Sequence, residues 1–283
     1  MSLWPEMANR AFAIKFIDAG GINTRYLEAG NHEAPAIIFI HGTGGHLETF
    51  NRNVFEHAKH FRVLALDMVG HGYSSKPDHP YEIRHYVKHL ADFMAALGIK
   101  KAHMHGESMG GWIAAQFAID HPEAVERLVL NTAGGLNTDE KVMERVYSVT
   151  MNAVKEGTFE AVRKRLEWLV HEPSQIPDDL VELRQNIYRQ PGFAKSMENI
   201  LCLQFMETRM RNVLTDESLG RIKAKTLVIW TDHDPTAPVA TGERFARAIP
   251  DARLVVMSDC AHWPQWEKTE EFNKLHTAFL LGQ

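Results

Sequence analysis

Short apolar runs alternate with longer amphipathic segments along most of the chain. Runs of four to seven residues bounded by polar positions are typical of strands buried inside a parallel sheet. Here they fall at residues 36–40, 62–66, 101–105, 127–130, 224–230 and 253–257. Helical patterns separate several of them, as at residues 83–97. Strands that alternate with helices predict an α/β fold with a mostly parallel, twisted sheet and right-handed crossover connections.

Two segments near the N-terminus have a different pattern. Residues 11–18 and 22–28 alternate apolar and polar positions on either side of Gly20 and Gly21. Such alternation indicates strands with one solvated face, and a glycine turn between them predicts an antiparallel hairpin. We expect this hairpin to open the fold.

The alternation of strands and helices stops between residues 136 and 213. This stretch contains amphipathic helical patterns, at residues 139–156, 158–169 and 178–189. The strand pattern then resumes, and a helical pattern at residues 269–281 ends the chain. The sequence therefore predicts an α/β core of residues 1–135 and 214–283, with residues 136–213 inserted as a helical cap or lid.

A G-x-S-x-G pentad, Gly106-Glu107-Ser108-Met109-Gly110, follows the apolar run at residues 101–105. This pattern mounts a serine on a sharp turn from strand to helix, where only glycine fits on either side. A helical pattern at residues 109–120 comes next, and Pro122 ends it because proline disfavours helical geometry in the residue before it. Strand, turn and helix in this order predict that Ser108 is a nucleophile.

A serine hydroxyl needs a histidine base, and the histidine needs an acid that holds its tautomer. Asp232 and Asp234 follow the strand predicted at residues 224–230, and His262 follows the one at 253–257. The resulting order of serine, acid and histidine is that of α/β-hydrolases. We favour Asp234 over Asp232 because the acid of this fold commonly lies four residues before a proline, here Pro238. Four other histidines lack this combination and are predicted to be structural or pocket-lining: His41, His46, His105 and His233.

An attacked carbonyl also needs hydrogen-bond donors for its developing negative charge. The predicted oxyanion-hole donors are the backbone N–H groups of Met109, directly after the nucleophile, and of Thr43. Thr43 lies in a glycine-rich turn after the strand at residues 36–40. A phosphate-binding loop is the alternative for such a turn, but neither G-x-x-x-x-G-K-[ST] nor G-x-G-x-x-G occurs there.

Composition narrows the class of partner. The 31 basic and 36 acidic residues give a formal net charge of −5, which disfavours nucleic acid and anionic membranes as partners and leaves a small-molecule substrate. The sixteen histidines are dispersed without a metal-binding motif, so we expect neither a metal nor a cofactor. Only two cysteines occur, Cys202 and Cys260, and no segment has the pattern of a signal peptide or membrane span. These features predict a soluble, cytoplasmic protein.

The chain resembles the α/β-hydrolases over nearly its whole length. The resemblance rests on His41-Gly42 after one strand, residues 67–74 after the next, the Ser108 pentad, the Asp234 loop and His262. It implies a hydrolase with the triad Ser108, Asp234 and His262. Haloalkane dehalogenases and epoxide hydrolases carry aspartate at the position of Ser108, so the resemblance disfavours both of those activities.

Within that superfamily the chain most resembles the meta-cleavage product hydrolases, which cleave a carbon–carbon bond in 2-hydroxy-6-oxohexa-2,4-dienoate-type ring-fission products. The similar segments are the histidine loop 262–267, the elbow 106–111, residues 133–136 and the region around Arg184. By resemblance Arg184 helps to bind the anionic dienoate end and Trp266 packs near the dienoate. The plainer interpretations are a solvated helix arginine and an ordinary packed aromatic. Gly42, Glu107, Arg184 and Trp266 are the predicted substrate-binding residues.

The chain departs from this family at two places. Glu107 stands where the family usually has asparagine, and the oxyanion loop is shortened to residues 43–46. A carboxylate at Glu107 would repel a dianionic dienolate unless it is protonated or paired.

The leading hypothesis is therefore a cofactor-independent carbon–carbon hydrolase of aromatic catabolism, in which Ser108 or a water that it activates attacks the C6 carbonyl. An ester or lactone hydrolase that forms an ordinary acyl-enzyme is the alternative, and pocket polarity separates the two. A non-enzymatic receptor on the same fold predicts an incomplete triad. The family resemblance also implies a homodimer or higher homo-oligomer.

Overall fold

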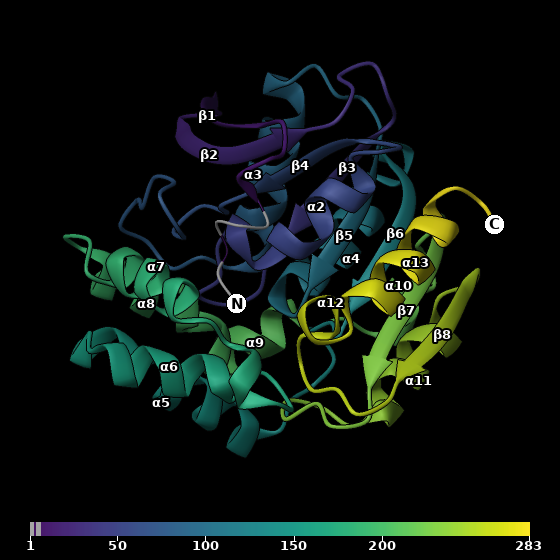
Figure 1. Cartoon of the computed structure of the whole chain (residues 1–283). Coiled ribbons are helices and arrows are strands. Elements are labelled where there is room, and N and C mark those ends of the chain that lie inside the picture. The colour runs from purple at the N-terminus through teal and green to yellow at the C-terminus, as the bar shows by residue number, and fades with distance from the viewer. Residues whose placement is uncertain (1–2, 4–6) are drawn as a thin grey trace.

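The apolar runs form six strands of one eight-stranded sheet, and five of these six are inner strands (Figure 1). We describe Leu3 and residues 7–283 of a computed structural model. The strand order is β1-β2-β4-β3-β5-β6-β7-β8. The strands are β1 (Phe12–Ala19), β2 (Ile22–Ala29), β3 (Ala36–Ile40), β4 (Arg62–Leu66), β5 (Ala102–Glu107), β6 (Val125–Asn131), β7 (Lys225–Thr231) and β8 (Ala252–Met257).

The hairpin and the parallel strands are both confirmed. Strand β1 pairs antiparallel with β2, and β2 pairs antiparallel with β4, whereas every later pairing is parallel. Parallel strands in register bring their carboxyl ends to one edge of the sheet. The segments that follow β3, β5, β7 and β8 therefore meet there, which places the four predicted site loops together.

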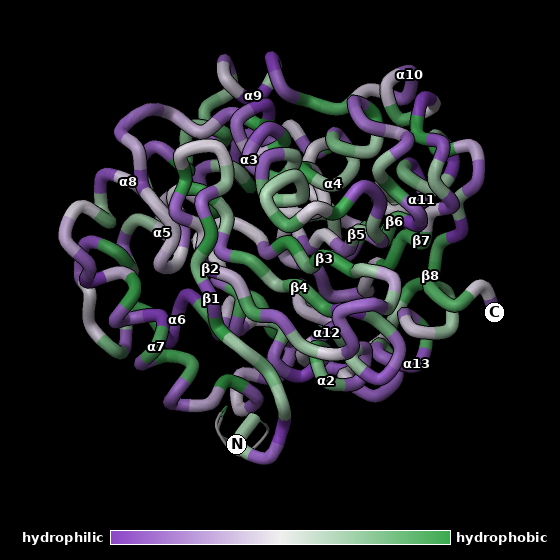
Figure 2. Tube along the Cα trace, turned by 90° about the horizontal axis from the view of Figure 1, so that it is seen from above, coloured by the Kyte–Doolittle hydropathy of each residue, from purple (hydrophilic) through white to green (hydrophobic). Residues whose placement is uncertain are grey.

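Helices cover both faces of the sheet, which explains why the inner strands are apolar throughout. In β3, Ile38 and Ile40 belong to one apolar cluster and Ile37 and Phe39 to the other. Figure 2 shows hydrophobic segments along the central strands and mostly hydrophilic ones at the periphery. The helices that flank the sheet are α2 (Asn51–His57), α3 (Ile83–Ala96), α4 (Met109–Asp120), α11 (Val239–Ala248), α12 (Pro264–Glu267) and α13 (Thr269–Leu280).

Between β6 and β7 the described chain contains helices and no strand. They are α5 (Glu140–Glu156), α6 (Phe159–Glu167), α7 (Asp178–Tyr188), α8 (Phe193–Ile200), α9 (Met206–Asn212) and α10 (Asp216–Leu219). The Asp139 side chain caps α5 by accepting a hydrogen bond from the Lys141 amide, and Gly157 ends it at a φ of 59°. Figure 1 shows α5 to α8 as a layer beside one end of the sheet. The division into core and cap stays a prediction, taken up below.

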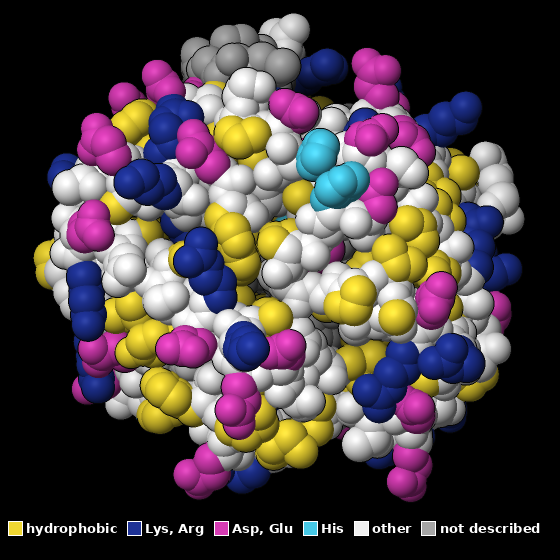
Figure 3. Space-filling model, turned by 90° about the horizontal axis from the view of Figure 1, so that it is seen from below, with side chains coloured by type: hydrophobic (Ala, Val, Ile, Leu, Met, Phe, Trp, Pro, Cys, Tyr) yellow, Lys and Arg dark blue, Asp and Glu magenta, His cyan; other side chains and the backbone are white. Residues whose placement is uncertain are grey.

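The surface mixes charges of both signs. Figure 3 shows acidic and basic side chains interspersed on the face seen from below, without a field of one sign. Of the helices in the described residues, none is both long and apolar enough to cross a bilayer. The predicted cytoplasmic location and homo-oligomeric state stay predictions.

Candidate active site

Ser108 sits at the sharp turn between β5 and α4, where its backbone has a φ of 55° and a ψ of −119°. A non-glycine residue at positive φ is strained and persists only where its surroundings hold it. Here the neighbouring glycines allow it: a Cβ on Gly106 would lie 2.2 Å from the Gly110 carbonyl oxygen, and one on Gly110 would lie 2.1 Å from that of Ile40. The strained turn leaves the Ser108 side chain half-buried at the edge of a cavity.

His262 and Asp234 meet at the carboxyl ends of β8 and β7. Nδ1 of His262 lies 3.0 Å from Oδ1 and 3.1 Å from Oδ2 of Asp234, and the Asp234 carboxylate is fully buried. The amide and hydroxyl of Thr236 each donate to Oδ1 at 2.8 Å and hold the carboxylate in place. The structure thus brings together the predicted acid and the predicted base.

The competing acid Asp232 has other partners. Its carboxylate lies 2.7 Å from Nδ1 of the neighbouring His233 and accepts the amides of Asp259 and Cys260. Asp232 therefore ties the two strand-end loops together at the surface, and Asp234 contacts His262 as predicted.

A second carboxylate faces the other side of the imidazole. Oε1 of Glu107 lies 3.4 Å from Nε2 of His262, and Oε2 accepts the Gly42 amide at 2.7 Å. Burial raises the pKa of Glu107 above its usual value, although His262 and the Gly42 N–H oppose that rise. Burial alone would lower the pKa of His262, but the charges of Asp234 and then Glu107 raise it. His262 is thus held between two buried carboxylates.

The predicted oxyanion donors flank the same serine. Met109 is the first residue of α4, so its N–H has no acceptor in a preceding helical turn. Thr43 lies in the tight turn that the Gly45 amide closes on the Gly42 carbonyl, and it lines the cavity together with Ser108 and Met109. The Gly42 amide faces Glu107, and a Cβ at Gly42 would lie only 2.8 Å from that of Ser108.

The cavity at Ser108 has two lobes of opposite character, which share Thr43, Ser108, Val146 and Thr236. The basic lobe is lined by Glu107, Arg165, Trp168, Arg184, His262 and Trp263. The apolar lobe is lined by Trp112, Ala133, Val142, Met143, Leu203 and Ala237, with the polar side chains Asn137, Gln204 and Arg209 beside them. A molecule bound across Ser108 would therefore place a polar end in one lobe and an apolar group in the other.

Two arginines in the basic lobe form no salt bridge with any of the residues that the structure describes. Arg184 on α7 and Arg165 on α6 are both almost fully buried. In the described part of the chain, Nε and Nη2 of Arg184 and Nη1 of Arg165 have no hydrogen-bond partner. Burial lowers the pKa of Arg165 to about 10, so this guanidinium stays charged near neutral pH. Buried guanidinium nitrogens without hydrogen-bond partners are costly, and a bound anion would relieve that cost.

The comparisons with known proteins agree with this geometry. Residues 35–269 match the family described as having the alpha/beta hydrolase fold. The chain belongs to that family. The hydrolase is 35% identical to a 2-hydroxy-6-oxo-6-phenylhexa-2,4-dienoate hydrolase of Comamonas testosteroni over 270 residues, which is 90% of each chain. A 2-hydroxy-6-oxononadienedioate/2-hydroxy-6-oxononatrienedioate hydrolase of the same species is 34% identical and is matched over 88% of this chain and 89% of its own.

Solved structures point the same way. A meta-cleavage product hydrolase from Pseudomonas fluorescens IP01 superposes on this chain with a TM-score of 0.85 at 30% identity. The superposition covers 95% of this chain and 97% of the Pseudomonas chain. Among the α/β-hydrolases the chain thus belongs with the meta-cleavage product hydrolases, as its resemblance to them implied.

Trp263, and not the predicted Trp266, lies at the cavity. The lining of the cavity includes Trp263 but not the predicted Trp266. The Trp266 indole donates its N–H to the Gln175 carbonyl at 3.1 Å, and its ring lies 4.0 Å from the Arg52 guanidinium carbon. The placement of Trp266 against the substrate is corrected accordingly: it packs behind the cavity, and the residue directly after His262 faces it.

Arg165 is the site residue that sequence reasoning missed. It shares the buried side of α6 with Val162 and Leu166, at helical spacing. An arginine on the apolar stripe of an amphipathic helix was the available signal, because a solvated arginine would sit on the opposite face.

The four histidines predicted to be structural or pocket-lining line neither lobe. Their ring nitrogens contact backbone or side-chain groups elsewhere: His41 contacts Gly42 and Met68, His46 contacts Glu48, His105 contacts His276, and His233 contacts Asp232. They are therefore structural in the hydrolase.

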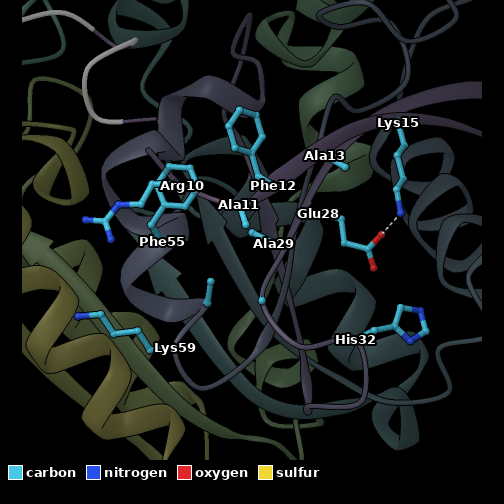
Figure 4. A pocket seen from close by; sticks show the side chains of 12 residues that line it. Arg10, Ala11, Phe12, Ala13, Lys15, Glu28, Ala29, His32, Phe55 and Lys59 are labelled. Carbon is cyan, nitrogen blue, oxygen red and sulfur yellow. Dashed lines mark hydrogen bonds and ion pairs between the residues drawn. The ribbon is translucent and has the colours of Figure 1, made fainter. Parts of the chain in front are cut away.

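A separate surface groove lies between the hairpin and α2 (Figure 4). Phe12 and Phe55 form part of its wall, and the Lys15 ammonium donates to Glu28 at 2.7 Å. The groove contains none of the predicted site residues, so the cavity at Ser108 is the candidate active site of the hydrolase.

Proposed function

We propose that this chain is a serine-dependent carbon–carbon hydrolase acting on 2-hydroxy-6-oxohexa-2,4-dienoate-type ring-fission products. The observation that carries the proposal is the basic lobe, where two buried guanidinium groups line the cavity with Ser108 and, among the described residues, keep nitrogen atoms without hydrogen-bond partners. A substrate that ends in a carboxylate supplies the missing negative charge. The names of the relatives support the same substrate class.

In this proposal the substrate lies across Ser108. Arg184, with Arg165 beside it, binds the C1 carboxylate, and Trp263 packs against the conjugated chain. The C6 carbonyl then lies at Ser108, and the C6 substituent occupies the apolar lobe. Residues 136–213 act as the cap, because α6 and α7 carry the two arginines and α5 contributes Val142 and Met143.

The chemistry follows from the groups at Ser108. The dienol first becomes a ketone, with His262 as the proton carrier. Ser108, or a water that it activates, then attacks the C6 carbonyl while His262 acts as base and Asp234 stabilises the imidazolium. The amides of Thr43 and Met109 stabilise the oxyanion. Breakage of the C5–C6 bond releases a dienoate and a carboxylic acid.

Turnover of chromophoric substrates tests the proposal. The 6-phenyl and 6-methyl dienoates should lose their colour rapidly, and Ser108→Ala should lower kcat by about 10³-fold or more. Ser148→Ala is a matched control, because that hydroxyl bonds to the Arg145 carbonyl on α5, and it should leave kcat unchanged. Rapid hydrolysis of p-nitrophenyl acetate with no loss of dienoate colour would contradict the proposal.

That last outcome would instead support an ester or lactone hydrolase. The apolar lobe is the feature that favours this second function, since it offers an acyl group a pocket next to Ser108. The same triad would then work through an ordinary acyl-enzyme. The alternative leaves the unpartnered nitrogen atoms of Arg165 and Arg184 without a role, which is why we place it second.

A further inference from the structure

The base of an ordinary triad has one carboxylate partner, but His262 has two. Asp234 lies against Nδ1 at 3.0 Å, and Glu107 lies 3.4 Å from Nε2, the nitrogen that serves the nucleophile. All three side chains are at least 97% buried, so water screens these charges little. Two negative neighbours stabilise an imidazolium rather than a neutral imidazole.

Glu107 is held so that one oxygen is anchored and the other faces the site. The Gly42 amide donates to Oε2 at 2.7 Å, which leaves Oε1 toward His262. Other charges face this carboxylate from the cap: Arg184 on α7, and Arg165 on α6, whose charge interacts with Glu107. Glu107 thus lies between the groups that we assign to the C1 carboxylate and the groups that act on C5 and C6.

We propose that Glu107 is a second acid–base group of this site, which keeps a proton on Nε2 of His262 in the free enzyme and exchanges a proton with the substrate's C2 oxygen during turnover. This inference rests on the proposed carbon–carbon hydrolase function. The placement follows from the lobe: C2 adjoins the carboxylate bound by Arg184, and Glu107 lines the same lobe.

The protons balance through the cycle. In ketonisation the C2 hydroxyl O–H bond breaks and its proton passes to Glu107, while electrons shift along the diene and C5 takes the Nε2 proton of His262. The neutral imidazole can then accept a proton from Ser108 or water. When the C5–C6 bond breaks, its electron pair returns to the C2 oxygen, which regains the proton from Glu107. The second product leaves as a carboxylate with one proton released to solvent.

This arrangement has opposite effects on the two candidate reactions. Ketonisation needs an acid on Nε2, so the imidazolium favoured by Glu107 promotes it. Ester hydrolysis needs a neutral imidazole, so the same carboxylate suppresses it at low pH. Removal of the Glu107 charge should therefore slow ketonisation and assist ester hydrolysis.

Glu107→Gln tests the inference because it keeps the shape of the side chain and removes its charge. Stopped-flow absorbance should show ketonisation of the 6-phenyl dienoate slowed by about 10²-fold. The acid limb of p-nitrophenyl acetate hydrolysis should move down by about one pH unit, which corresponds to a roughly tenfold faster rate at pH 6. Glu107→Asp should recover part of the ketonisation rate. The control is Glu207→Gln, since that side chain is 92% exposed on α9, and it should change neither quantity.

Several results would overturn the inference while leaving the proposed function intact. In each of them the wild type turns over dienoates. In the first, Glu107→Gln ketonises the 6-phenyl dienoate at the wild-type rate; in the second, Glu107→Gln loses ketonisation and ester hydrolysis to the same extent. A wild type that cannot turn over dienoates would contradict the proposed function itself. If the variant does not fold, nitrogen-15 NMR of histidine-labelled wild type decides: His262 should be doubly protonated at pH 7, and a neutral ring would overturn the inference.

Discussion

The two lobes of the cavity lie between the cap and the same edge of the sheet, yet their arginines have different partners. In the basic lobe, nitrogen atoms of Arg165 and Arg184 lack partners among the described residues. In the apolar lobe the one lining arginine, Arg209, donates to the backbone carbonyls of Asn137 and Leu203. The basic lobe therefore leaves cationic hydrogen-bond donors for a ligand, whereas Arg209 is used by the cap itself.

This difference assigns separate roles to the two ends of a substrate. An anionic end gains charge-assisted hydrogen bonds in the basic lobe, and these depend strongly on the ligand's charge. A C6 substituent in the apolar lobe gains mainly from the area that it buries, which depends on its size and shape. Variants in the basic lobe should thus discriminate by charge, and variants in the apolar lobe by volume.

Of the variants that test this difference between the lobes, Arg184→Ala should have the largest effect on kcat/KM. Loss of a buried cation that holds a carboxylate should lower kcat/KM for both dienoates by about 10²-fold or more. Hydrolysis of p-nitrophenyl acetate, which has no carboxylate, should stay within about threefold of wild type. Steady-state assays of the three substrates measure the contrast.

Arg211→Ala is the matched control for that variant, because Arg211 is half-exposed and bonds to Glu207 on the surface of α9. It should leave all three substrates unaffected. An unchanged KM for the dienoates in Arg184→Ala would show that the guanidinium is not a carboxylate ligand. That result would contradict the claim that the basic lobe selects substrates by charge.

A smaller effect should follow from Val142→Phe in the apolar lobe. Val142 lies half-buried on α5, so the larger ring takes space from the lobe without filling a packed core. The kcat/KM for the 6-phenyl dienoate should fall by about tenfold, because the bulky substituent no longer fits. The 6-methyl dienoate serves as the internal control and should change little. Equal losses for both substrates would place the C6 substituent elsewhere.

The sequence indicated the three residues of the proposed triad more directly than the substrate contacts, and topology explains why. Ser108, Asp234 and His262 each follow a strand, and parallel strands necessarily bring such residues to one edge of the sheet. Their meeting therefore requires only the order of the strands, which the apolar runs made visible. The choice of Asp234 over Asp232 likewise depended on local spacing, from a proline four residues away.

Contacts between the cap and the core could not be obtained in this way. Arg165 reaches the lobe only because α6 packs over the strand ends, and the distance between Glu107 and His262 depends on how two loops fold against each other. Neither follows from a repeating pattern along the chain. Trp266 illustrates the same limit: the family resemblance implied a substrate contact, but the short helix α12 turns it away from the cavity.

The smallest expected change in KM concerns Trp263 and Trp266. Trp263→Phe should raise the KM for the dienoates several-fold, because its indole lines the basic lobe with its ring 5.6 Å from the Arg184 guanidinium carbon. Trp266→Phe loses the hydrogen bond to Gln175 and should lower the free energy of unfolding by about 1 kcal/mol, with KM within twofold of wild type. Dienoate kinetics together with denaturant unfolding separate the two outcomes. A larger change in KM for Trp266→Phe than for Trp263→Phe would reverse the assignment and restore the contact that the family resemblance implied.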